Sequence, residues 1–568
     1  LSVAASATTT GGATGAGANQ TYTATAIELG ASAAAPDFDA SGTAAGGNIT
    51  VSATNIRLDN DNGITFTTSG AVAGTADDGA INLSGAVNGL VAGAQDLTLT
   101  ADTGTISVDS IGQATALGGF TVSAGTGTTN LDGSISVKGA DNGIAIDRAG
   151  IVLHRAVTLS ALDGDVSIND LAGNGNSLTI TADINDTTAG AISLAAISDV
   201  SDLTATAGQE LTTTGAIAGS GDISLTANDN NDANNEDLTV NGNIIGSTVT
   251  LSTGTATDSD VKIVVAINNT AGSLSIETDN SVELGVDISS LGNLDITGQV
   301  DISGGARTIT STEGNITTAE IDGSEALAVS AANGSVTFGA ALGVTTPLDS
   351  IDVDAQQATI TNKINTDNGD IDFRDTAATV LSGAVILDTE DGDDDAAGSV
   401  LFGNGSIDAA TAGATLTINT AVASNSAGDV SFGAVGGNAA IGSLTVSHKG
   451  LAADDGTITL SGNITTTGVI DLDNDATDTD IDLAGNVTIV SGGTNITLGS
   501  AGAGDVLDGA FSLAVLAGAG EVDLPLITEI TGLTTTSAAV RVHNAVTVAG
   551  PISMTATEAV EIDGAITT

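Results

Sequence analysis

The residues of this chain best suited to chemistry are carboxylates spaced two apart in short acidic runs. Two such runs contain Asp471, Asp473, Asp475 and Asp482, and Asp391, Asp393 and Asp395. Calcium takes roughly six to eight oxygen ligands, and carboxylates at alternating positions of a tight loop can supply several of them. The alternative is that these runs are solvated, charge-bearing loops. Both interpretations stay open, and calcium is the one cofactor that the sequence suggests.

The first run has part of the spacing of an EF-hand loop. Asp471, Asp473 and Asp475 follow the i, i+2, i+4 pattern, and Asp482 stands where such a loop places its bidentate acid. Ala476 occupies the position at which the loop requires Gly, so an EF-hand is not expected.

The one concentration of basic residues contains Asp147, Arg148, His154 and Arg155. Carboxylates and a basic residue lining one groove are what a polysaccharide lyase or hydrolase of the β-helix type would use. A local ion-pair patch is the interpretation we favour, because a sugar cleft also needs aromatic platforms, and aromatic residues make up only 2% of the chain. Its three His residues are far apart in sequence and it has no Cys, so zinc sites and Cys nucleophiles are unsupported. We assign no catalytic residue and expect no enzyme.

The net charge of −59, from 69 acidic and 10 basic residues, bounds the partners of the chain. Such a field repels a phosphate backbone, so nucleic acid and anionic lipid are not expected as partners. No apolar run approaches the ~18 residues that a membrane-spanning helix needs, and no signal peptide is visible at the start.

The elements that would position these residues are short strands. Apolar-x-apolar pairs bounded by Gly, Asn, Ser or Asp recur along the chain, and this period of two predicts strands. The order strand, turn, strand, bend, strand is repeated in three segments that begin at Leu97, Leu327 and Leu416. Matching strands are offset by roughly 20 to 28 residues, which is typical of stacked repeats.

We therefore predict an all-β fold: a parallel β-helix, or β-solenoid, of roughly two dozen rungs if each uses about 24 residues. Residues 1–47 are a low-complexity Ala/Thr/Gly-rich start or incomplete first rungs, and residues 48–568 form one continuous repeat region. The alternative is a string of immunoglobulin-like sandwiches, which would show a core Trp or Tyr in each unit. The chain has no Trp and one Tyr.

Two polar patterns accompany the strands. Asn follows Gly at five strand starts, namely Asn48, Asn243, Asn315, Asn463 and Asn486. These side chains could bond to a neighbouring rung, but Asn is also a common turn residue, and we favour that plainer interpretation. Thr alternates with apolar residues at Leu97–Thr100, Leu178–Thr181 and Thr415–Thr420, so hydroxyls should face outward together in ladders. An ordered Thr face could bind a glycan or ice, but Thr is also an ordinary β-former.

The strings SAGDVSFGAVGGNAAIGSLTV, NGSVTFGAALGVTTPLDSIDV and GANQTYTATAIELGA resemble the repeats of giant bacterial surface adhesins of the filamentous-haemagglutinin-like type. The resemblance covers most of the chain, although individual repeats are degenerate. It implies a secreted protein whose repeats form a right-handed parallel β-helix that serves as a stalk. The secretion domain and the anchoring region of that family are missing here, so the chain is expected to be a segment of a longer protein.

From these features we expect a non-enzymatic structural protein of the bacterial cell surface: the stalk of a secreted adhesin, or a subunit of an extracellular fibre or sheath. Its expected partners are neighbouring copies of the same chain or other cell-surface components, including glycans, because unpaired strand edges at the ends of a solenoid must be covered. A surface-layer lattice protein and a polysaccharide-acting β-helix enzyme are the two alternatives.

Overall fold

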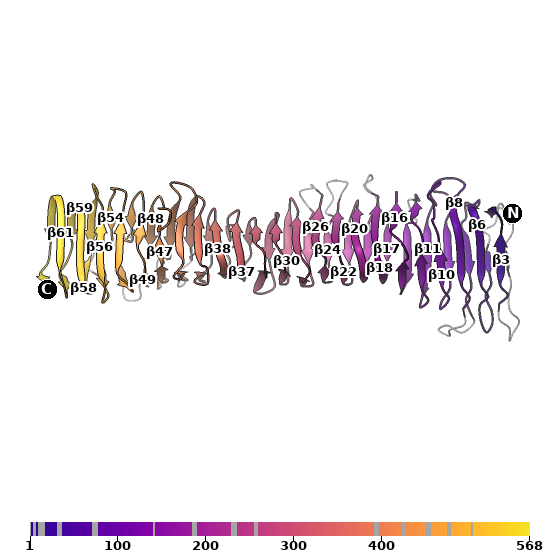
Figure 1. The fold of residues 1–568 in the computed structure, drawn as a ribbon, viewed down its shortest axis with the longest axis horizontal. Coiled ribbons are helices and arrows are strands. Elements are labelled where there is room, and N and C mark those ends of the chain that lie inside the picture. The colour runs from indigo at the N-terminus through magenta and orange to yellow at the C-terminus, as the bar shows by residue number, and fades with distance from the viewer. Residues whose placement is uncertain are drawn as a thin grey trace. The chain divides into compact units, whose positions relative to one another are not determined.

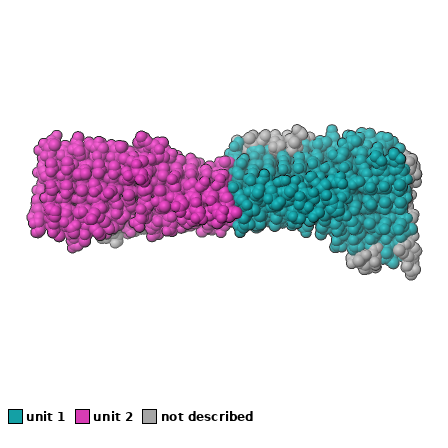
Figure 2. All heavy atoms as spheres, in the orientation of Figure 1, with its two compact units in different colours: residues 1–283 teal, residues 284–568 magenta. Residues whose placement is uncertain are grey.

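The computed structural model describes residues 2–3, 7–8, 17–30, 37–70, 78–139, 143–183, 190–228, 236–254, 259–390, 397–422, 426–448, 456–473, 479–500 and 504–568. The chain is all-β, without a helix in these ranges, and forms a parallel β-solenoid of about 20 turns. This confirms the predicted fold class. The chain divides into two compact units, residues 1–283 (unit 1) and residues 284–568 (unit 2), which Figure 2 shows in teal and magenta.

One face of unit 1 is a row of short parallel strands, one from each turn (Figure 1). The row runs β7 (Ile64–Thr67), β9 (Leu97–Thr100), β11 (Phe120–Gly125), β14 (Ile144–Arg148), β17 (Val166–Ile168), β19 (Ile192–Leu194), β21 (Leu211–Thr213), β24 (Leu238–Val240) and β27 (Val261–Ile263). The alternation of period two turns every second side chain inward. Phe120, for example, stacks between Leu97 and Ile144, and all three are buried.

A second face of unit 1 carries the predicted hydroxyl ladders. It consists of β16 (Val157–Ala161), β18 (Leu171–Ala182), β20 (Ile197–Ala207), β23 (Asp222–Ala227), β26 (Thr248–Thr253) and β29 (Ser273–Glu277). Thr181, Thr206, Thr226 and Ser252 are stacked in register on its outer side. Thr226 and Ser252 are joined by a hydroxyl–hydroxyl hydrogen bond of 2.9 Å, so the expectation of outward ladders is confirmed here.

Long strands carry the chain around a corner from one face to the next. The start of β18 pairs with β15 (Ile151–Leu153), and its end pairs with β16. Between the two parts the register shifts, and Asn174 adopts a φ of 52° there. Gly175, with a φ of 73°, follows it. Two successive residues in the left-handed region therefore bend the strand without interrupting it.

Unit 2 repeats the scheme with different side chains. One face follows β38 (Ser350–Ile360), β40 (Ile371–Phe373), β43 (Val400–Phe402), β46 (Val430–Phe432), β49 (Thr457–Leu460), β52 (Asp480–Leu483), β55 (Val506–Asp508) and β58 (Leu526–Ile530). Another includes β45 (Thr415–Asn419), β48 (Leu444–Ser447), β51 (Ile470–Asp471) and β54 (Ile496–Thr497). Phe373, Phe402 and Phe432 stack in the interior, with ring centroids 5.5 and 6.1 Å apart.

The three segments that the sequence aligned share one bend. In each, a Gly with φ between 67° and 69° is followed a few residues later by a buried Leu or Ile: Gly112 and Leu117, Gly343 and Leu348, Gly436 and Ile441. A Cβ on any of these Gly residues would lie 2.0 or 2.1 Å from a carbonyl oxygen of the next turn. Only Gly fits, because the φ and the close approach both exclude a side chain.

Parallel pairing excludes the immunoglobulin-like alternative, whose sheets are antiparallel. The turn length varies more than the sequence predicted. Ile49, Ile81 and Ile106 are stacked partners, so these two turns are 32 and 25 residues long, and the chain has about 20 turns instead of two dozen. Strands also lie within residues 1–47: β3 (Gln20–Thr23) and β4 (Ala26–Leu29) both pair with β6 (Ile49–Leu58).

Candidate functional site

Of the predicted calcium ligands that the structure describes, Asp482 lies on a different strand face from Asp471. Asp471 faces outward on β51, between Thr445 and Thr497, and its Oδ1 accepts a hydrogen bond of 3.3 Å from the backbone N–H of Asp473. Asp473 is buried, and its Oδ1 accepts a bond from the Thr479 hydroxyl. Asp475, Asp391, Asp393 and Asp395 lie outside the described residues.

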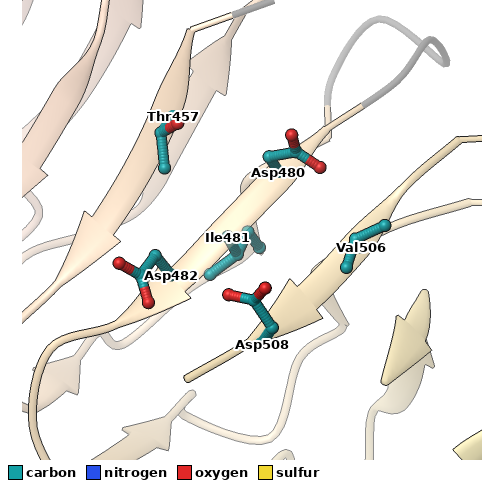
Figure 3. A pocket seen from close by; sticks show the side chains of 6 residues that line it. All are labelled: Thr457, Asp480, Ile481, Asp482, Val506 and Asp508. Carbon is teal, nitrogen blue, oxygen red and sulfur yellow. The ribbon is translucent and has the colours of Figure 1, made fainter. Parts of the chain in front are cut away.

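Asp482 instead belongs to an acidic hollow of unit 2. The hollow has a volume of about 390 Å³ and is lined by Thr457, Asp480, Ile481, Asp482, Val506 and Asp508. Asp482 and Asp508 are direct neighbours on β52 and β55, and Figure 3 shows both carboxylates at the hollow, with Asp480 further along the strand. Burial raises the pKa of Asp508, and the negative charges of Asp482, Asp480 and Glu529 raise it further.

A second carboxylate pair lies on the same face of unit 2. Asp352 on β38 is the direct neighbour of Asp372 on β40. Burial raises the pKa of Asp352, as do the charges of Asp372, Asp375 and Asp354. Arg374 binds both oxygens of Asp372, with its Nε at 3.1 and 2.9 Å, and so offsets part of the repulsion. The hollow around Asp508 contains no such cation among its lining residues.

Asp408 is a unit 2 carboxylate in the opposite situation. It is buried at the bend of the third aligned segment, where Oδ1 accepts bonds from the backbone N–H groups of Asn438 and Ala439 and Oδ2 accepts one from the Asn438 amide. Burial acts to raise the pKa of Asp408, but these bonds outweigh it and hold the pKa below its usual value. Asp322 and Asn88 occupy the same place at the other two bends.

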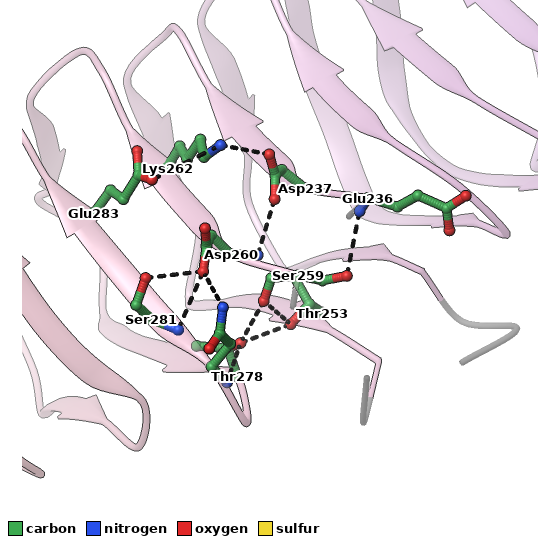
Figure 4. A network of polar contacts seen from close by, with 10 residues as sticks. Glu236, Asp237, Thr253, Ser259, Asp260, Lys262, Thr278, Ser281 and Glu283 are labelled. Carbon is green, nitrogen blue, oxygen red and sulfur yellow. Dashed lines mark hydrogen bonds and ion pairs between the residues drawn. The ribbon is translucent and has the colours of Figure 1, made fainter. Parts of the chain in front are cut away.

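The corner of unit 1 that precedes β24 and β27 holds a polar network (Figure 4). Oδ1 of Asp260 accepts bonds from the Asn280 amide at 2.7 Å and from the backbone N–H and hydroxyl of Ser281 at 3.2 and 2.8 Å. The backbone N–H of Asp260 in turn donates to Oδ1 of Asp237. The carboxylate of Asp237 or Asp260 in one turn therefore accepts a hydrogen bond from a backbone N–H group of the turn that follows.

Lys262 offsets part of the negative charge of this corner. Its Nζ lies 2.5 Å from Oδ2 of Asp237 and 3.8 Å from Oε1 of Glu283. The hydrogen bond to Asp237 raises the pKa of Lys262, against the smaller opposing effect of partial burial. The amine thus stays protonated, which suits an ion pair and not a nucleophile.

The five Asn residues singled out in the sequence all bond to the next turn. The side-chain oxygens of Asn48, Asn243, Asn315, Asn463 and Asn486 accept bonds from the backbone N–H groups of Ala80, Asn268, Ser335, Thr488 and Ser512. The distances are 2.7 to 3.0 Å. Of the two interpretations that the sequence left open, the cross-turn bond is the one the structure shows, and our preference for a plain turn residue was wrong. We call this set the Asn ladder.

The basic concentration of unit 1 is not a single patch. Arg148 is fully buried, whereas Asp147 and Arg155 are exposed. Arg148 donates from Nε to Gly127 O at 3.1 Å and from Nη2 to Gly104 O at 2.7 Å and Asp102 O at 3.3 Å, while Nη1 bonds to Ala101 O. The expected local ion pair is therefore wrong for Arg148, because its partners are backbone carbonyls. His154 pairs with Asp132, with Nδ1 2.8 Å from Oδ1.

The described ranges contain no group of three or more His, Cys, Asp or Glu residues arranged to hold a metal ion. Within the same ranges, no helix is long and apolar enough to cross a membrane. Comparison of the chain with protein-family models, curated proteins and solved structures finds no match.

Sequence reasoning missed the Asp508 partner of Asp482 and the inward position of Arg148. The first depends on register: the two strands pair 26 residues apart, across a connection whose length no motif reveals. The second did have a signal. Arg148 continues the alternation of Ile144 and Ile146, both buried, so the period of two places it on the inner side of β14.

Proposed function

We propose that this chain is a non-enzymatic structural element of a bacterial cell surface, either the stalk of a secreted adhesin or a subunit of an extracellular fibre or sheath. The observation that carries the proposal is the repetition of cross-turn bonds through both units. Neighbouring turns are joined by backbone pairing and by interior rows, and at five places also by the Asn ladder. Stability in such an array comes from contacts between neighbouring turns, so it can be extended by adding turns.

The contacts made by the basic and acidic side chains support a structural role as well. Arg148 is occupied by four carbonyls in the interior, and Lys262 is held by Asp237 and Glu283. The carboxylates at the acidic hollow lie among aliphatic residues and a Thr, with no basic residue in the lining. The partners that suit this surface are further copies of the same chain or other cell-surface components, including glycans bound along the hydroxyl ladders.

Electron microscopy of the native assembly tests the proposal. Thin fibres, or filaments projecting from the cell, are the expected result. A two-dimensional lattice would assign the chain to a surface layer instead. The complete reading frame is the second test, because secretion and anchoring regions flanking this chain are what an adhesin stalk requires.

A panel of neutral and acidic polysaccharides tests the enzymatic alternative. We expect no cleavage. Cleavage that is lost in Asp147→Asn or Arg155→Met would contradict the proposal, since both residues are exposed and outside the interior contacts of Arg148. Cleavage that persists in both variants would indicate a contaminant or a different site, which Asp480→Asn and Asp508→Asn would then separate.

A further inference from the structure

Arg148 is the one Lys or Arg side chain that is fully buried in the described residues. Its guanidinium contacts carbonyls of two preceding turns: Ala101, Asp102 and Gly104 belong to the loop after β9, and Gly127 to the turn after β11. No carboxylate of the described residues lies within ion-pair distance of the guanidinium. Burial lowers the pKa of Arg148, and the charges of Asp102 and Asp78 oppose that effect from further away. A buried charge that is satisfied only by a fixed set of backbone atoms is highly sensitive to where those atoms lie.

The rows of apolar side chains do not have this sensitivity. Shifting one strand by two residues keeps every inward side chain inward, because the side-chain period is two. If β14 shifted by two, so that Asp147 faced Thr121, Ile146 would face Phe120 and Arg148 would face Val122. The alternation of buried positions is therefore kept in the shifted register, and the residue that it places worst is Arg148.

The space around the guanidinium is fitted to it. A Cβ at Gly127 would lie 2.1 Å from Nη2 of Arg148 and 2.3 Å from the backbone oxygen of Gly104, so a Gly is needed where the guanidinium passes. On the other side of the same loop, Oδ2 of Asp78 accepts a bond of 2.8 Å from the backbone N–H of Thr103. The loop of residues 101–104 is thus held by a carboxylate on one side and by the guanidinium on the other.

We propose that Arg148 is a register lock, a side chain that fixes which residues of three successive turns stack on one another. A two-residue shift of β14 moves the guanidinium by roughly 6.6 Å along the strand. All four carbonyls would then be out of hydrogen-bonding range, and a buried charge would be left unsatisfied. The shifted register is disfavoured for that reason, although its apolar side chains still face inward.

Disulfide trapping tests the proposal, because the chain has no Cys of its own. Thr121 and Ala145 are direct neighbours on the outer side of β11 and β14, and Asp147 is two residues further along. In the native register the pair Thr121→Cys and Ala145→Cys has the Cα separation of about 5 Å that a disulfide accepts. The pair Thr121→Cys and Asp147→Cys is about 8 Å apart and closes only after a shift by two.

With Arg148 present, we expect the first pair to cross-link and the second to remain reduced. Arg148→Met keeps a long apolar side chain but no donors, and should lower the ratio of native to shifted cross-link at least tenfold. Arg155→Met, an exposed neighbour, is the matched control and should leave the ratio unchanged. An unchanged ratio in Arg148→Met would overturn the proposal.

Arg148→Met could unfold these turns, and then neither Cys pair would cross-link. Arg148→Lys is the variant that tests the proposal in that case. Lys retains the charge but offers one nitrogen instead of three. A native cross-link with a ratio between those of Arg and Met supports the register lock. A ratio equal to that of the parent chain would show that the pattern of four carbonyl bonds is not what fixes the register.

Discussion

Carboxylates are concentrated both at the corner of unit 1 around Asp260 and on the strand face of unit 2 around Asp508. The two regions differ in the groups that surround the carboxylates. At the corner, three donors converge on one oxygen of Asp260, and Lys262 neutralises Asp237. On the strand face, Asp482 and Asp508 are stacked on adjacent strands, and the pKa of Asp508 is raised by burial and by its neighbours. A carboxylate therefore stabilises a turn where backbone N–H groups point at it, and destabilises it where it faces another carboxylate.

The largest effect should come from removing the corner carboxylate. Asp260→Ala leaves the Asn280 amide and the Ser281 donors without their acceptor, and we expect a loss of about 3 kcal/mol in the free energy of unfolding. Urea unfolding of the full chain measures this. Asp170→Ala, at an exposed position of the same unit, is the control and should change stability little. Equal losses of stability in Asp260→Ala and Asp170→Ala would show that the hydrogen bonds of Asp260 do not stabilise the corner.

Asp408 tests the same idea inside unit 2. Asp408→Ala should cost about 2 kcal/mol at pH 7, because two backbone donors and an amide lose a charged acceptor. The pKa of Asp408 is lowered in the folded protein, so its contribution is present above the unfolded pKa and is lost as the pH falls through the folded one. The gap between Asp408→Ala and the parent chain should therefore shrink in acid. A gap that is constant with pH, or matched by the exposed Asp563→Ala, would contradict this.

The Asn ladder should contribute equally in the two units, since its geometry is the same in both. Asn243→Ala in unit 1 and Asn463→Ala in unit 2 each remove one acceptor of a backbone N–H, at a cost of about 1 kcal/mol. Hydrogen exchange at Asn268 and Thr488, the residues whose N–H groups lose their acceptor, reports the effect locally. Asn404→Ala, at an exposed position, should leave exchange unchanged. If the two variants differed in their effect, contacts other than the Asn ladder would be stabilising these strand starts.

Replacing a carboxylate of the strand face should stabilise the chain instead of destabilising it. Asp508→Asn removes repulsion from Asp482 and should raise stability by about 0.5 kcal/mol at pH 7, as expected for like charges on adjacent strands. The pKa of Asp508 is raised in the folded state, so the folded chain binds the proton more readily and the penalty appears as the pH rises through that pKa. The gain should vanish in acid. Destabilisation by Asp508→Asn at neutral pH would refute this account of the hollow.

Calcium should give the smallest shift and should act on the face and not on the corner. At a concentration equal to its Kd, a bound ion adds about 0.4 kcal/mol. Millimolar calcium added to chelated protein should raise the thermal midpoint of the parent chain and of Asp260→Ala, but not of Asp508→Asn. A shift that survives in Asp508→Asn and disappears in Asp391→Asn/Asp393→Asn/Asp395→Asn would place the ion in the other acidic run. No shift under any condition would favour solvated loops.

The sequence predicted what depends on local alternation and could not predict what depends on register. The strands, their parallel stacking and the three shared bends follow from apolar-x-apolar pairs and from Gly residues such as Gly343, where a φ of 67° is combined with a carbonyl oxygen 2.1 Å from the position of a Cβ. The grouping of Asp482 with Asp508 depends on turn length, which ranges from 33 residues between Ile64 and Leu97 to 18 between Val522 and Val540. Asp471 and Asp482 are close in sequence, yet they lie on strands of different faces.

The Asn ladder also explains a motif that is usually connected with carbohydrate attachment. At a ladder position Asn accepts from the next turn, the following residue points into the core, and the one after it points outward, where a hydroxyl suits a strand. Asn48-Ile49-Thr50, Asn315-Ile316-Thr317, Asn463-Ile464-Thr465 and Asn486-Val487-Thr488 fit this rule. Each also spells the N-x-T acceptor sequon of N-glycosylation. In this architecture the sequon is a by-product of stacking turns, so its recurrence says nothing about whether the chain carries sugars.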